Sequence, residues 1–188
     1  LSEQHVSRGL AVSDYDNDGD MDFVLVQPGE GAQLFRNDMQ TGHWLKVRLR
    51  SRLKDGRPLG FGDGAKVIAH VGAAVLRRTV SSVSYLSQSS RTLHFGLGTA
   101  VKVDQLEVRW HAGGTNFYSN VDADSTWEIS EGEPTPKRIG GVGLGGREQP
   151  RSDNRPPPTA ILNEQGLVVA APTGKIDKAS LLNFWNKQ

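Results

Sequence analysis

The most regular feature of the sequence is an alternation of apolar and polar residues over short runs. Residues 45–50 place Leu, Val and Leu at every second position, with Lys, Arg and Arg between them. This period of two predicts a strand with one buried face and one basic face. The same kind of pattern predicts further strands at residues 22–26, 65–71, 74–80, 92–96, 106–110, 115–118 and 126–130.

Turn-forming pairs separate these runs. Asp-Gly occurs at 55–56 and 63–64, and Gly-Gly occurs at 113–114. Such pairs favour turns, since glycine reaches backbone conformations that other residues avoid. We find no run with a helical period before residue 132. Short strands joined by turns of this kind are typical of an antiparallel β-sandwich or barrel, so we predict an all-β fold class.

Composition divides the chain into four segments. Residues 1–42 form an acidic segment, in which residues 1–38 hold eight acidic and two basic residues, a net charge of −6. Residues 43–132 form the strand-rich domain. Residues 133–160 contain six prolines and five glycines, a composition that predicts a flexible linker. Residues 161–188 are predicted to form a docking tail with a short hairpin around Gly166 and a short helix after Asp177.

Composition also excludes several classes of protein. The chain has no cysteine, which excludes a disulfide scaffold and a cysteine-ligated zinc site. No apolar run approaches the roughly 20 residues of a membrane-spanning helix. The net charge of +1 over 188 residues argues against a nucleic-acid partner. The chain begins at Leu1 without a targeting segment, which indicates a fragment or a processed protein.

The strongest local signal is a run of alternating aspartates at Asp14, Asp16, Asp18, Asp20 and Asp22. Five carboxylates within nine residues repel one another unless a cation or solvent screens them. A hard cation such as Ca²⁺ takes six to eight oxygen ligands and suits this spacing. We predict that Asp20 binds Ca²⁺ through its backbone carbonyl and that the other four bind through their side chains.

Three alternatives compete with this calcium site. An EF-hand has the same opening spacing, with glycine at position 6, where Gly19 stands, but it requires a bidentate Glu at position 12, where this chain has Leu25. The segment after Asp22 also has the pattern of a strand. Mg²⁺ fits less well, since it prefers a rigid octahedron with several waters. A solvated acidic turn without any cation is the third alternative.

The residues around the aspartates carry a family resemblance. The sequence of residues 8–23, followed by 34–37, resembles a calcium-binding FG-GAP (VCBS) repeat, the blade unit of integrin-type β-propellers. The match covers about residues 5–38. The resemblance implies that this segment is a single calcium-loop blade remnant of a propeller whose other blades lie elsewhere.

A second resemblance runs from residue 43 to 132. The motifs at 64–67, 84–89, 93–98, 103–104 and 108–110 resemble those of the ASPIC/UnbV domain, which follows FG-GAP repeats in the cartilage acidic protein-like family. This resemblance implies a secreted, periplasmic or cell-surface protein in which a β-domain is appended to a calcium-stabilised propeller and serves adhesion or interaction.

Within this domain, Tyr85, Gln88, Ser89 and His94 are candidates for a patch that recognises a glycan or a peptide. The alternative is architectural, with these polar groups satisfying turns. No zinc-helix histidine pair, nucleophile elbow or phosphate loop occurs, so we predict no catalytic residues.

We therefore predict a non-enzymatic, calcium-binding interaction or adhesion module. Its expected partners are another protein or the remaining propeller blades, with a glycan also possible, and neither nucleic acid nor a membrane span is expected. Two alternatives remain open. One is an accessory subunit of a larger enzyme or electron-transfer assembly, and the other is an enzyme with an unrecognised site.

Overall fold

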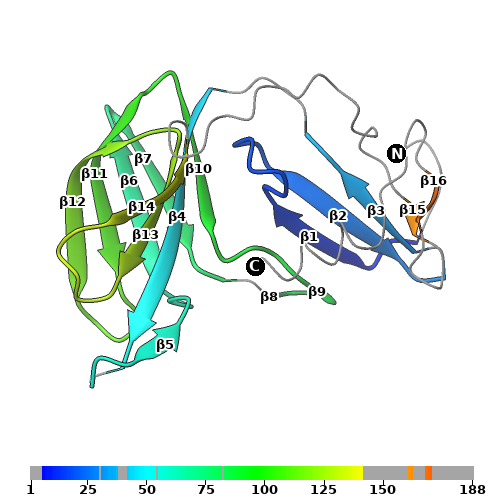
Figure 1. Cartoon of the computed structure of the whole chain (residues 1–188), viewed down its shortest axis with the longest axis horizontal. Helices are drawn as coiled ribbons and strands as arrows, with labels where there is room; N and C mark the ends of the chain where they lie inside the picture. The colour runs from blue at the N-terminus through cyan, green and yellow to red at the C-terminus, as the bar shows by residue number, and fades with distance from the viewer. Residues whose placement is uncertain are drawn as a thin grey trace. The chain divides into compact units, whose positions relative to one another are not determined.

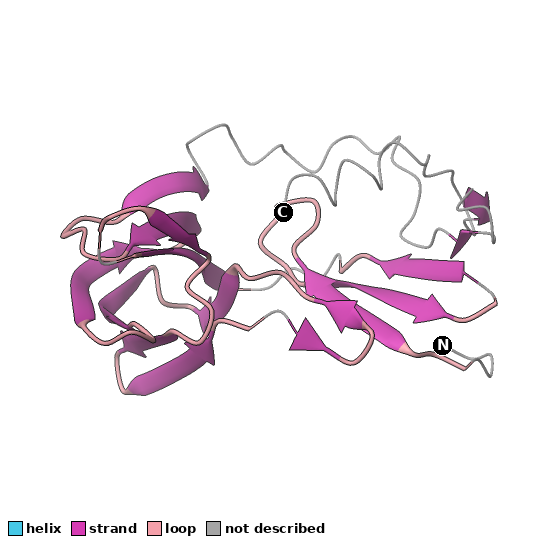
Figure 2. Ribbon diagram, turned by 90° about the horizontal axis from the view of Figure 1, so that it is seen from below, coloured by secondary structure: helices cyan, strands magenta, loops and turns pink. Residues whose placement is uncertain are grey.

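The computed structural model describes residues 6–29, 31–37, 42–53, 55–81 and 83–141, together with two short strands at 161–162 and 168–170. Every regular element in these ranges is a strand (Figure 2), which confirms the all-β prediction. Within the same ranges there is accordingly no helix of the length and apolar character needed to cross a membrane. The predicted helix after Asp177 lies outside the described residues.

The chain divides into two compact units. The first unit comprises Leu1–Met39, Ser82–Ser90 and Gln149–Gln188, and the second comprises Gln40–Ser81 and Arg91–Glu148.

The second unit contains two sheets (Figure 1), in which neighbouring strands are antiparallel except for the parallel pair β4 and β13. One sheet has the order β10-β4-β13-β14, with β5 paired to β4, and the other has the order β12-β11-β6-β7. Their strands are β4 (His43–Arg52), β5 (Pro58–Gly60), β6 (Lys66–Val71), β7 (Ala74–Thr79), β10 (Leu93–Gly98), β11 (Lys102–Arg109), β12 (Thr115–Asp122), β13 (Ser125–Ser130) and β14 (Lys137–Gly141).

The alternating apolar residues of these strands meet between the two sheets. Leu45, Val47 and Leu49 on β4 pack in one cluster with Val67 on β6 and Val108 on β11. All of these are buried, so the two sheets form a sandwich around one hydrophobic core. The sheets do not close into a barrel in the described part of the chain.

One strand of the second unit was not expected. β14 lies inside the segment predicted as a linker, and it pairs with β13 through Trp127 and Arg138. The prolines and glycines of residues 133–160 led to the linker prediction, but Lys137, Arg138 and Ile139 suffice for a short edge strand. The sheet therefore extends to Gly141.

The first unit is a single sheet of order β1-β2-β3-β15-β16. β1 and β2 pair from Gly9 opposite Val26 to Ser13 opposite Asp22. The strands are β1 (Gly9–Ser13), β2 (Asp22–Gln27), β3 (Gly31–Phe35), β15 (Ile161–Leu162) and β16 (Val168–Ala170). The antiparallel pairing of β15 with β16 confirms the short hairpin predicted around Gly166.

A small hairpin from the middle of the chain also belongs to the first unit. It consists of β8 (Val83–Ser84) and β9 (Ser87–Gln88). Ser87 Oγ donates to the carbonyl of Leu10, and the N–H of Val12 donates to Ser89 Oγ at 3.2 Å. The N–H of Ser90 donates to the carbonyl of Val12. The hairpin and the residues after it thus satisfy backbone groups on the outer edge of β1, an edge that would otherwise require solvent or another strand.

Candidate functional site

The aspartate run forms the loop between β1 and β2. Asp14 follows the last residue of β1, and Asp22 is the first residue of β2. Since Ser13 lies opposite Asp22 in the strand register, both ends of the loop are fixed by the β1–β2 pairing. The intervening residues must therefore turn back within a short distance.

Two residues in left-handed conformations make that turn possible. Gly19 has a φ of 103° and Asn17 has a φ of 62°. Glycine adopts positive φ freely, and asparagine does so more readily than most other residues. The N–H of Gly19 donates to Asp14 Oδ2 at 3.0 Å, which holds the far side of the loop over its start.

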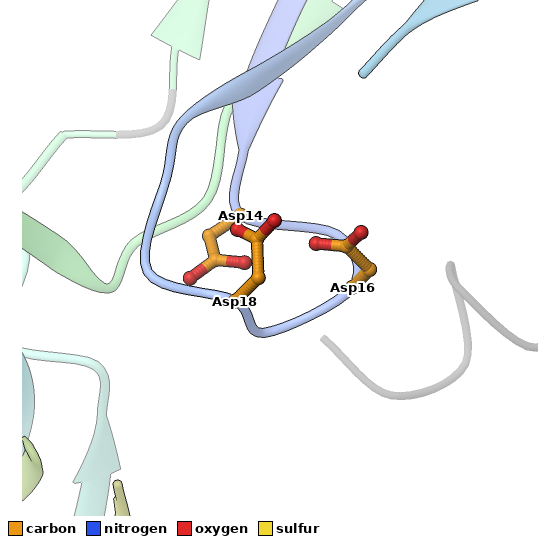
Figure 3. Close-up of side chains that lie close together, drawn as sticks. All are labelled: Asp14, Asp16 and Asp18. Atoms are coloured by element: carbon orange, nitrogen blue, oxygen red, sulfur yellow. The ribbon is translucent and has the colours of Figure 1, made fainter. Parts of the chain in front are cut away.

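The loop brings three of the five predicted ligands together. Carboxylate oxygens of Asp14, Asp16 and Asp18 all lie within 4.8 Å of one another. Figure 3 shows the three side chains converging on the inside of the loop. Asp14 is buried, Asp16 is half-buried and Asp18 is exposed, so the cluster extends from the protein interior to the solvent. The Oδ1 atoms of Asp14 and Asp16 are themselves shielded from solvent.

The other two predicted ligands have different surroundings. Asp22 is 1% exposed, and its carboxylate accepts the N–H of Tyr15 and the N–H of Asn37, each at 2.8 Å. Asp22 therefore joins the loop to the end of β3. Asp20 is half-buried, and its N–H donates to Asp18 Oδ1 at 2.9 Å.

The electrostatics of the loop reflect crowding of like charges. Burial and the charges of Asp18 and Asp14 raise the pKa of Asp16 to about 6, although the nearby Arg36 guanidinium opposes this rise. Burial likewise raises the pKa of Asp18. For Asp22, burial raises the pKa to about 7, against the lowering effect of the Asn37 and Tyr15 N–H groups. A site of this kind holds negative charge at an energetic cost that a bound cation would relieve.

The sequence reasoning missed two residues of this site, Arg36 and Asn37. Both follow β3, and neither carries a carboxylate. Asn37 holds Asp22 through its backbone N–H, a group that every residue except proline has. The signal available was the position of residues 34–37 within the FG-GAP resemblance.

The four residues predicted as a recognition patch fall in two different units. Tyr85, Gln88 and Ser89 belong to the hairpin segment of the first unit, and His94 lies on β10 of the second. Tyr85 and Gln88 are exposed, whereas Ser89 accepts the N–H of Val12. The His94 ring stacks on Trp44 with a centroid separation of 6.5 Å.

The similarity to a known protein family lies mainly in the second unit. Residues 57–136 match the family model described as ASPIC and UnbV. This match starts just before β5 and ends just before β14, so it covers most of the sandwich and the hairpin of the first unit.

The chain is also similar to cartilage acidic protein 1. The Mus musculus and Homo sapiens proteins are each 33% identical to it over 111 residues, and the Xenopus tropicalis protein is 32% identical over the same length. Each alignment covers 56% of this chain and 16% of the relative, so the chain spans only a small part of the length of these proteins.

Proposed function

We propose that this chain is a non-enzymatic interaction module whose first unit binds Ca²⁺ through the β1–β2 loop. The observation that carries the proposal is the convergence of the Asp14, Asp16 and Asp18 carboxylates within 4.8 Å. Three carboxylates at this separation repel one another, and the raised pKa of Asp16 and of Asp18 records that repulsion together with burial. A divalent cation bound among them would replace the repulsion with attraction.

The donor set fits Ca²⁺ better than other biological cations. All the donors are oxygens, which suit a hard cation, and the chain offers neither cysteine nor a histidine in this loop. In the proposed site the side chains of Asp14, Asp16 and Asp18 bind first, and the Asp20 carbonyl and the Asp22 carboxylate complete it. Since a carboxylate oxygen has two lone-pair directions, Asp22 can keep its two N–H bonds and still ligate.

The fold around the loop supports a propeller-type blade. Strands β1, β2 and β3 form an antiparallel meander, with the aspartate loop between β1 and β2. Phe23 and Phe35 lie directly opposite each other on β2 and β3 and stack at 4.6 Å between ring centroids. We propose on this basis that residues 5–38 are an FG-GAP-like repeat and that the remaining blades are its nearest partners.

The hairpin of the first unit supports a role in protein binding. Its side chains Val83, Tyr85 and Leu86 are large, apolar and between 69% and 81% exposed. Exposed aromatic and aliphatic groups gathered on one hairpin are typical of protein-binding surfaces. We propose that these side chains contact a protein partner outside the cell or in the cell envelope. An extracellular location agrees with the name of the similar protein, cartilage acidic protein 1.

Calorimetric titration of the full chain with calcium tests the proposal. We expect saturable binding of about one Ca²⁺ per chain, and loss of at least about tenfold in affinity for Asp18→Asn because one charged ligand is removed. The matched control is Asp55→Asn, which removes an aspartate that pairs with Arg57 in the other unit and should leave affinity unchanged.

A thermal-unfolding experiment provides the second measurement. At a free calcium concentration 100 times the Kd, binding should stabilise the first unit by about 2.7 kcal/mol, and chelation with EDTA should remove that gain. Absence of calcium binding by the full chain, or equal affinity of the Asp18→Asn variant, would overturn the site. A stronger preference for Mg²⁺ would overturn the assignment to calcium.

A further inference from the structure

The outer face of the sheet β12-β11-β6-β7 carries an uneven distribution of charge. One face of this sheet packs into the core through Leu106, Val108 and Val67, and the other face lies away from the core. In Figure 1 these four strands form the layer on the left. Lys66 and Arg109 lie directly opposite each other on β6 and β11 in the strand register. Arg77 on β7 is opposite Ile68, one row away on the same face.

A single carboxylate lies among these cations. Glu107 is opposite Ile68 on one side and opposite Phe117 on the other. It is 9% exposed and accepts a hydrogen bond from Arg109 Nε. Because the side chain sits on the outer face, the neighbouring side chains cover it. The hydrogen bond from Arg109, together with the charges of Arg109, His70 and Arg77, lowers the pKa of Glu107 against the raising effect of burial.

The face therefore has an excess of positive charge. Glu107 balances one cation, and Lys66, Arg77 and Arg109 supply three, all of them exposed. The other acids on these strands lie outside this group. Asp104 accepts the N–H of Gly72, and Asp122 pairs with Lys102 at the start of β11.

An aromatic ring adjoins the cations. Phe117 on β12 is 57% exposed and lies beside Glu107 in the register. Neighbouring strands in a sheet are about 4.8 Å apart, and residues on the same face of one strand are about 7 Å apart. The ring and the cations therefore span a surface about one to two nanometres across. A sugar ring can place its apolar C–H face on such an aromatic ring while its charged substituents reach the cations.

We propose that the outer face of β12-β11-β6-β7 binds an anionic polysaccharide, with Lys66, Arg77 and Arg109 pairing with its sulfate or carboxylate groups and Phe117 supporting a sugar ring. The face suits a charged chain better than a protein. A protein interface buries about 800 Å² on each partner around a core that is poor in charge. On this face Lys66, Glu107 and Arg109 lie on the two inner strands, and Phe117 and Arg77 lie on the edge strands β12 and β7.

The test uses the full chain and a sulfated hexasaccharide prepared from heparin, with binding measured by calorimetry at several salt concentrations. We expect the double variant Lys66→Gln/Arg77→Gln to bind about tenfold more weakly. Its affinity should also depend less steeply on salt, because fewer counterions are released when fewer cations contact the polyanion. The matched control, Arg57→Gln/Lys137→Gln, removes the same charge from exposed positions outside this sheet and should change affinity less than twofold.

Phe117→Ser separates the aromatic contribution from the electrostatic one. This exposed position leaves no cavity in the core, so the fold should be kept, and affinity should fall about threefold with the salt dependence unchanged. Equal weakening by the control pair would overturn the proposal, as would equal binding of an uncharged hexasaccharide. Tighter binding of poly-glutamate or of single-stranded DNA would overturn the assignment to a polysaccharide.

Discussion

The two units of this chain bury different kinds of side chain. In the second unit the fully buried side chains are apolar apart from Ser125, with Leu45 and Phe95 at 0% exposure, and the largely buried Glu107 is paired with Arg109. In the first unit, Leu34 is buried together with the carboxylates of Asp14 and Asp22. Hydrophobic burial depends little on ions, whereas the cost of a buried carboxylate depends on what neutralises it. One chain thus combines a part stabilised by packing with a part whose stability depends on protons and, in our proposal, on calcium.

The largest expected effect is on the packed unit. Phe95→Ala removes a fully buried ring from the sandwich core and should lower the free energy of unfolding of the second unit by about 3–5 kcal/mol. Urea unfolding followed by amide NMR signals from β4 and β11 measures the loss, which should be the same with calcium or EDTA. The matched control is Val101→Ala, an exposed apolar position in the same unit. A loss below about 1 kcal/mol, or one that calcium restores, would contradict the comparison.

The next effect belongs to the acidic loop and concerns pH. The pKa of Asp16 is raised to about 6 and that of Asp22 to about 7, so the folded loop favours the protonated carboxylates. Without calcium, stability of the first unit should therefore be highest below about pH 4 and should fall as the pH rises to about 7. With calcium the added stabilisation should grow over the same range, since ligation requires ionised carboxylates.

Unfolding monitored by NMR signals from β1 and β2, in EDTA and in millimolar calcium, measures both trends. Signals from β4 in the same samples serve as the internal control. If the first unit in EDTA became more stable as the pH rose from 4 to 7, the raised pKa values would be wrong.

The smallest expected effect concerns the exposed hairpin. Leu86 has a φ of 54°, a left-handed conformation that costs a bulky residue about 1–2 kcal/mol, and its side chain is largely exposed. Leu86→Gly should relieve that strain and raise the stability of the first unit by up to about 1 kcal/mol, net of the entropy that glycine loses on folding. Thermal unfolding measures the gain. Val83→Ala, also on the hairpin and exposed, should leave stability within about 0.5 kcal/mol. Destabilisation by Leu86→Gly would mean that this side chain makes contacts that stabilise the fold.

The strands could be predicted from sequence because their signal is local. Residues 45–50 alternate strictly in sequence, and β4 buries Leu45, Val47 and Leu49 as predicted, although Lys46 on the predicted basic face is also buried, at 6% exposure. The partner of a strand is not a local property. β4 pairs in parallel with β13, which lies some 80 residues further along, and no feature of either run specifies that register. β14 was missed because prolines and glycines on both sides outweighed three suitable residues.

The candidate site shows the same division. Alternate spacing within one loop was enough to predict that Asp14, Asp16 and Asp18 converge, since neighbours in sequence turn together. The surroundings of Asp22 were not predictable, because its contact with the Asn37 N–H depends on how β2 pairs with β3. The position of the hairpin beside β1 was not predictable either. It depends on hydrogen bonds between serine hydroxyls and backbone groups that any strand edge offers.

That hairpin has a consequence for how the chain can be divided. Residues 87–90 and strand β1 complete each other's hydrogen bonds, although more than seventy residues of sequence separate them. A shortened chain beginning at the sandwich would keep the hairpin and lose β1, so Val83, Tyr85 and Leu86 would lie on a segment free to replace its counterpart beside β1 of a full-length molecule. Exchange of such a segment between copies is a low-cost route to dimers. Residues 9–13 and 87–90 therefore depend on each other structurally, and any shortened or recombined form of this chain should keep both or delete both.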